Sequence, residues 1–85
     1  MKFKYIDIRD WIYVFNAAVW MGHSPSIAGV QLYFYHKNSR TFLICTSGKR
    51  ENSGKHSVLL VEDTEEKQFR QMMEKALEGY EIVWH

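Results

Sequence analysis

The stretch VQLYFYHKNSRTFLICTS, residues 30–47, decides the fold. It contains two runs rich in β-branched and aromatic residues, Val30–Tyr35 and Thr41–Ser47, on either side of the polar segment 36–40. Two such runs around a short polar segment are typical of a β-hairpin. We therefore expect two antiparallel strands joined by a turn at residues 36–40.

Three further segments have strand character. Residues 57–62 form a mainly apolar run after the polar loop 48–56, which predicts a third strand. In residues 80–85 every second side chain is large and apolar, so this segment is expected to add an edge strand. Residues 2–6, where two aromatic residues alternate with lysines, leave a short N-terminal strand as an open alternative.

A first helix is expected over residues 8–21. Apolar residues recur there three and four positions apart, which is the spacing of one helical face. Asp7 is a suitable N-cap, and Gly22 suits the left-handed residue that ends a helix. One proline and two glycines then indicate a loop over residues 22–29.

A second helix is expected to begin at Asp63 or Thr64 and to end near Gly79. Glu66 lies in its first turn, where the helix dipole favours negative charge, and is spaced to pair with Arg70. The apolar stripe of this helix comprises Phe69, Met72, Met73, Ala76 and Leu77.

These elements give the order (β)-α-β-β-β-α-β. We expect one α+β domain over residues 1–85, with two helices packed on one side of a small antiparallel sheet. The 85 residues are 46% hydrophobic and 15% aromatic, which suffices for a core without disulfides. The expected core residues are Trp11, Phe15, Val58, Leu60, Phe69, Met72 and Leu77.

Composition excludes several classes of protein. The 11 basic and 10 acidic residues give a net charge of +1, which provides no general attraction for nucleic acid or anionic membranes. Cys45 is the only cysteine, so no internal disulfide can form, and a lone thiol suits a reducing compartment. We find no signal-peptide pattern and no apolar run long enough to span a bilayer. The expected location is the cytoplasm.

No residue pattern indicates catalysis. His23, His36, His56 and His85 lie far apart in the sequence, without the short spacings of metal ligands, so no metal site or cofactor is expected. Cys45 lies within an expected strand, where a buried thiol is common. We therefore expect neither an enzyme nor a small-molecule substrate.

The loop 48–56 is the candidate for RNA or DNA contact. The side chains expected to reach phosphates are Lys49, Arg50, Lys55 and His56, and nearby tyrosines would offer stacking faces for single-stranded RNA. The order helix, three strands, helix also resembles the double-stranded-RNA-binding domain. That family has basic residues at the start of its second helix, whereas this chain has acidic ones, so the resemblance covers topology alone.

Surplus apolar surface indicates protein binding. Tyr13 and Trp20 lie outside the main stripe of the first expected helix, so that helix is apolar nearly all round. Tyr33 and Tyr35 lie on a sheet face that the helices would leave partly bare, together with Leu43, Leu59 and Val61. We expect Tyr13, Trp20, Tyr33 and Tyr35 to contact another protein or a second copy in a homodimer. The alternative is that these apolar side chains belong to a thick hydrophobic core of the domain itself.

In composition the chain resembles the compact accessory proteins of tailed bacteriophages, some of which disarm host nucleases, toxins or restriction systems. It uses many Lys, Ile, Phe and Tyr residues beside few Arg, Ala and Pro residues. The resemblance implies a non-enzymatic protein that regulates or inhibits a larger protein or complex.

Overall fold

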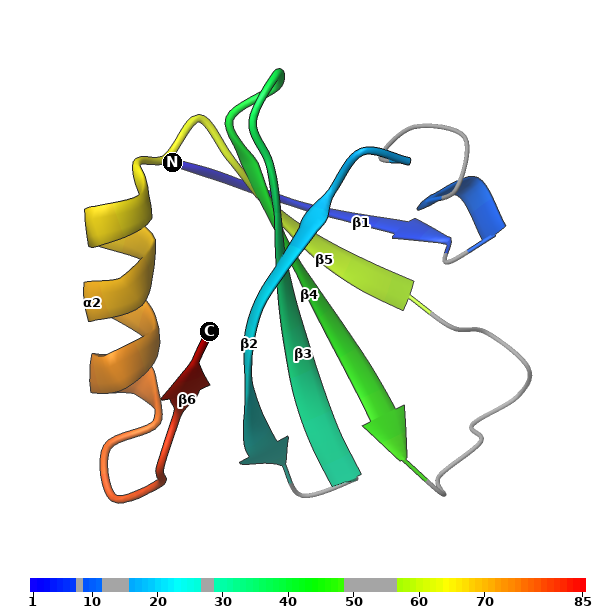
Figure 1. Cartoon of the computed structure of the whole chain (residues 1–85). Helices are drawn as coiled ribbons and strands as arrows, with labels where there is room; N and C mark the ends of the chain where they lie inside the picture. Colours follow the sequence, from blue (N-terminus) through cyan, green and yellow to red (C-terminus); the bar gives the residue numbers. More distant parts are fainter. Residues whose placement is uncertain (8, 12–15, 27–28, 49–56) are drawn as a thin grey trace.

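The computed structural model describes residues 1–7, 9–11, 16–26, 29–48 and 57–85. Its elements in chain order are β1 (Lys2–Asp7), β2 (Val19–Ser26), β3 (Gly29–His36), β4 (Thr41–Gly48), β5 (Ser57–Glu62), α2 (Glu66–Ala76) and β6 (Val83–Trp84) (Figure 1). The strands form one antiparallel sheet in the order β1-β5-β4-β3-β2-β6. The fold is thus α+β and mostly sheet.

The expected hairpin is confirmed as β3 and β4. Its register pairs Val30 with Ser47 and Tyr35 with Phe42. The turn is closed by a hydrogen bond of 3.2 Å from the Arg40 N–H to the Lys37 carbonyl. The third strand and the C-terminal edge strand are confirmed as β5 and β6. The N-terminal segment, which the sequence left open, forms the strand β1.

The first expected helix is wrong over its second half. Residues 9–11 are helical, but β2 begins at Val19 and runs through most of the segment expected to be a loop. Val19 and Trp20 are a β-branched and an aromatic residue, which suit a strand as well as a helix. Pairing with β3 along the whole of β2 outweighs the local helical spacing.

Pro25 is compatible with β2 because β6 covers only part of this strand. β6 pairs with Gly22 and His23 alone, so β2 is an edge strand at Pro25. Proline lacks an N–H and is tolerated at such edges.

The second expected helix is confirmed, with a different cap. Glu65 is the N-cap, in a capping box with Gln68, whereas Asp63 adopts a positive φ of 53°. Thr64 is buried, and its hydroxyl donates to the Glu62 carbonyl. The expected pair of Glu66 and Arg70 forms at 3.3 Å.

The apolar layers lie on both faces of the sheet, which corrects the expectation of two helices on one face. Figure 1 shows α2 on the left of the sheet and the helical residues 9–11 (blue) on the right. The α2-side cluster comprises Met21, Tyr33, Phe42, Ile44, Val61, Phe69 and Met73. The opposite cluster comprises Leu43, Cys45, Val58 and Leu60, with Trp11 and Ala18 packed against it.

This division separates residues that the sequence interpretation had grouped. Val58 and Leu60 are buried on the opposite face from Phe69, although all three belong to the core as expected. Leu43 lies on the other face from Tyr33, because strand neighbours alternate between faces. Of the remaining expected core residues, Trp11, Met72 and Leu77 are half-buried, and Phe15 is outside the described residues.

Candidate protein-binding surface

Tyr33, expected to contact a partner, is instead a core residue. Its side chain is fully buried, with ring contacts to Phe69 at 5.9 Å and Trp84 at 5.6 Å between centroids. The phenol oxygen hydrogen-bonds to the Ser24 hydroxyl and donates to the Gln31 side-chain oxygen. Burial raises the pKa of Tyr33, and the Ser24 hydrogen bond lowers it by less. The assignment of Tyr33 to an accessible surface is therefore wrong.

The other predicted contact residues have different positions. Tyr35 is half-buried and stacks on Phe42 at 4.6 Å between centroids. Tyr13 lies outside the residues that the structure describes, as do Lys49, Arg50, Lys55 and His56. Trp20 is therefore the one well-exposed member of the predicted partner-binding set among the described residues.

Trp20 is both exposed and held in place. Trp20 keeps 48% of its surface accessible, yet its indole N–H donates to the Gly22 carbonyl at 2.9 Å. Trp20 pairs across the sheet with Phe34, which places it on the face away from α2. A fixed aromatic side chain loses little conformational entropy when a partner covers it.

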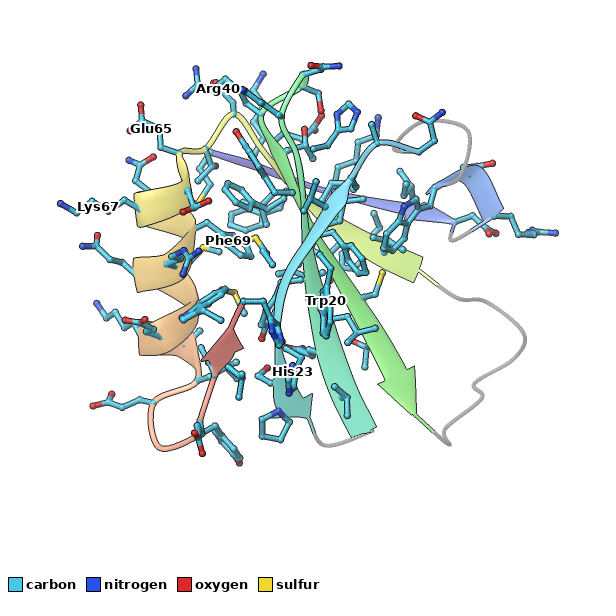
Figure 2. The ribbon with its side chains drawn as sticks, viewed as in Figure 1. Trp20, His23, Arg40, Glu65, Lys67 and Phe69 are labelled. Atoms are coloured by element: carbon cyan, nitrogen blue, oxygen red, sulfur yellow. The ribbon has the colours of Figure 1, made fainter. Side chains whose placement is uncertain are left out.

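Two histidines pack beside Trp20. The His85 ring lies 4.2 Å from the indole and the His23 ring 6.1 Å from it, between centroids. Figure 2 shows Trp20 and His23 on neighbouring parts of β2. The register shift between Trp20 and Gly22 inserts an extra residue, so side chains three positions apart share one face.

Apolar side chains complete this surface. His23 pairs with Leu32 on β3 and with Val83 on β6, so the three lie on one face. Val83 is 38% exposed, and Val30, two positions from Leu32, is 40% exposed. We define the Trp20 surface as Trp20, His23, Val30, Leu32, Val83 and His85.

A second exposed aromatic pair lies at the far edge of the sheet. Phe3 and Tyr5 of β1 are 59% and 70% exposed. They pair with Val61 and Leu59 and therefore face the same side as α2. α2 packs against residues of other strands, including Phe42, and leaves these two rings open.

Metal-ligating side chains and the Cys45 thiol are the groups of the described residues that bear on chemistry. The described residues contain no group of three or more His, Cys, Asp or Glu side chains that could hold a metal ion. Burial raises the pKa of Cys45 to about 12, so its thiol stays protonated and is a poor nucleophile at neutral pH. Among the same residues, no helix has the length and apolar character required to cross a membrane.

The chain matched no protein-family model, no curated protein and no solved structure. Its function is therefore inferred from the geometry of its own residues.

Sequence reasoning missed most of the Trp20 surface. His23 and His85 are 62 positions apart, and only the pairing of β2 with β6 brings them together. The large apolar residue at every second position of residues 80–85 was the signal that predicted this edge strand. No comparable signal indicated the register shift in β2.

Proposed function

We propose that this chain is a non-enzymatic binding protein that docks its Trp20 surface against another protein. The observation that supports the proposal most directly is the Trp20 indole, half-exposed yet anchored by its hydrogen bond to Gly22. Tryptophan is enriched among the residues that dominate binding energy at interfaces. A rigid anchor surrounded by valines and imidazoles has the composition of an interface centre.

The biological role proposed for this surface is regulation or inhibition of a larger protein or complex. The resemblance in composition to bacteriophage accessory proteins favours a host nuclease, toxin or restriction system as the target. A cytoplasmic location belongs to the same proposal. The free, buried Cys45 is compatible with a reducing compartment.

The test compares two charge-introducing variants at opposite edges of the sheet. Purified wild-type chain, Trp20→Glu and Tyr5→Glu are each used to capture partners from nuclease-treated bacterial lysate. Trp20→Glu is expected to abolish capture because a charged carboxylate replaces the exposed aromatic anchor that the partner would cover. Tyr5→Glu is expected to retain capture, because Tyr5 is more accessible than Trp20 but lies on the opposite face.

The comparison requires that both substituted chains remain folded. Both variants must unfold cooperatively on heating, and Val30→Glu replaces Trp20→Glu if the latter does not fold. Capture that survives Trp20→Glu and Val30→Glu would contradict the proposal. Loss of capture with Tyr5→Glu alone would indicate that the interface lies at β1.

Light scattering separates a homodimer from a different partner. A specific interface buries roughly 800 Å² on each side, which requires residues around the Trp20 surface as well as Trp20 itself. A wild-type dimer that Trp20→Glu converts to a monomer would identify a second copy as the occupant. A wild-type monomer that captures one protein would identify a heterologous partner.

Contact with RNA or DNA through residues 48–56 remains the alternative. Combined substitution of Lys49, Arg50 and Lys55 is expected to weaken such binding and to reduce its salt dependence. Capture that depends on intact nucleic acid would favour this alternative over direct protein binding.

A further inference from the structure

The imidazole rings of His23 and His85 meet at the junction of β2 and β6. Nδ1 of His23 lies 3.2 Å from Nε2 of His85, and the ring planes differ by 27°. We propose that these two nitrogens together bind a divalent transition-metal ion of the Zn²⁺ or Cu²⁺ class. This inference goes beyond protein binding, because the site requires no partner.

The separation of the two nitrogens suits a shared ion. Nitrogen ligands at the usual Zn–N distance and a tetrahedral angle lie about 3.3–3.4 Å apart. The 3.2 Å between His23 and His85 needs only a small opening to reach that span. Without metal, the same distance allows one ring N–H to donate to the other ring.

Both rings can become ligands without losing a proton. Neutral imidazole carries one N–H, which can reside on either ring nitrogen. In the metal-bound form the proton of His23 resides on Nε2 and that of His85 on Nδ1. The two facing nitrogens then each present a lone pair to the ion.

The backbone holds these two ligands in place. His23 is paired on both sides, with Leu32 of β3 and Val83 of β6. The His85 N–H donates to the Met21 carbonyl at 2.9 Å. The Trp20 ring packs against the His85 ring at 4.2 Å, which limits its rotation. Ligands supported in this way lose little freedom on binding.

The ligand chemistry selects the class of ion. Imidazole suits zinc, copper and nickel, whereas calcium and magnesium prefer oxygen ligands. Two protein ligands leave further positions on the ion for water. A bound ion would join β6 to β2 and is expected to stabilise the folded chain by mass action.

Calorimetric titration of the purified full chain with ZnCl₂ tests the proposal. The variants are His23→Gln and His85→Gln, with His36→Gln as the matched control. His36 contacts Ser39 in the β3–β4 turn and is not part of the pair. Even loss of an outer-shell partner weakens metal binding by about 10–100-fold, so either ligand substitution should weaken it at least about tenfold. His36→Gln should bind one Zn²⁺ ion like the wild type.

Imidazole nitrogen NMR of the wild-type chain gives an independent readout. Zn²⁺ should shift Nδ1 of His23 and Nε2 of His85 together, and should raise the unfolding temperature. Absence of binding at millimolar Zn²⁺, or unchanged binding in either ligand variant, would overturn the metal site. Because no partner is present, that failure would leave Trp20-dependent protein capture unaffected.

Discussion

Gly22 allows β6 to approach β2 closely, so Gly22→Ala is expected to displace β6. A Cβ at this position would lie 2.6 Å from the Val83 carbonyl oxygen and 3.3 Å from the Trp84 Cα. Both are backbone atoms and cannot rotate away, so the strand itself must move. Overpacking of this kind costs about 1–3 kcal/mol. Reduced entropy of the unfolded chain offsets about 0.4–1 kcal/mol, leaving a net loss of about 1.3 kcal/mol at the middle of both ranges.

Urea denaturation measures the loss, and hydrogen exchange locates it. The His85 amide, bonded to the Met21 carbonyl in the native sheet, should lose protection in Gly22→Ala. Gly79→Ala is the matched control because Gly79 has a φ of 94° with no atom near an added Cβ. It should lose stability through backbone strain while the His85 amide stays protected. Wild-type stability and protection in Gly22→Ala would refute the close-approach argument.

Three further substitutions test the interior. Phe69→Ala removes a fully buried ring stacked on Phe42 at 4.2 Å and should lower the free energy of unfolding by about 3–5 kcal/mol; an unchanged urea midpoint would contradict its core assignment. Tyr33→Phe leaves the buried Ser24 hydroxyl without this partner and should lower the free energy of unfolding by about 1–3 kcal/mol. A variant as stable as the wild-type chain would argue against the hydrogen bond. Since burial raises the pKa of Cys45 from 9.0 to about 12, the unfolded chain loses a proton that the folded chain keeps between those pH values. Stability should therefore fall as pH rises through this window, and less so in Cys45→Ala, as pH-dependent denaturation would show.

The strands and the second helix were predictable because local signals agreed with tertiary structure. In residues 30–47 composition and turn chemistry both indicate a hairpin, and β3 and β4 confirm it. In residues 19–21 the apolar run fitted a helix and a strand equally, so only pairing with β3 distinguished them. The assignment of layers failed for a related reason, since sequence does not reveal which sheet face a helix will cover.

The candidate surface was predictable only in part. Trp20 was identified from surplus apolar character, although its position on β2 was not. In a regular strand Trp20 and His23 would point to opposite faces, and only the register shift between them places both on one face. Tyr33 was misassigned because alternation shows which residues share a face but not whether that face is covered.

The strand order β1-β5-β4-β3-β2-β6 has a consequence for folding kinetics. Neighbours β2, β3 and β4 follow one another along the chain, so their pairing closes only short loops. The edge pairings, β1 with β5 and β2 with β6, join segments distant in sequence and carry a larger loop-closure entropy. The central meander is therefore expected to form in the transition state and the two edges after it. Substitutions in the β3–β4 turn should then slow folding, whereas those that loosen β6 should mainly accelerate unfolding.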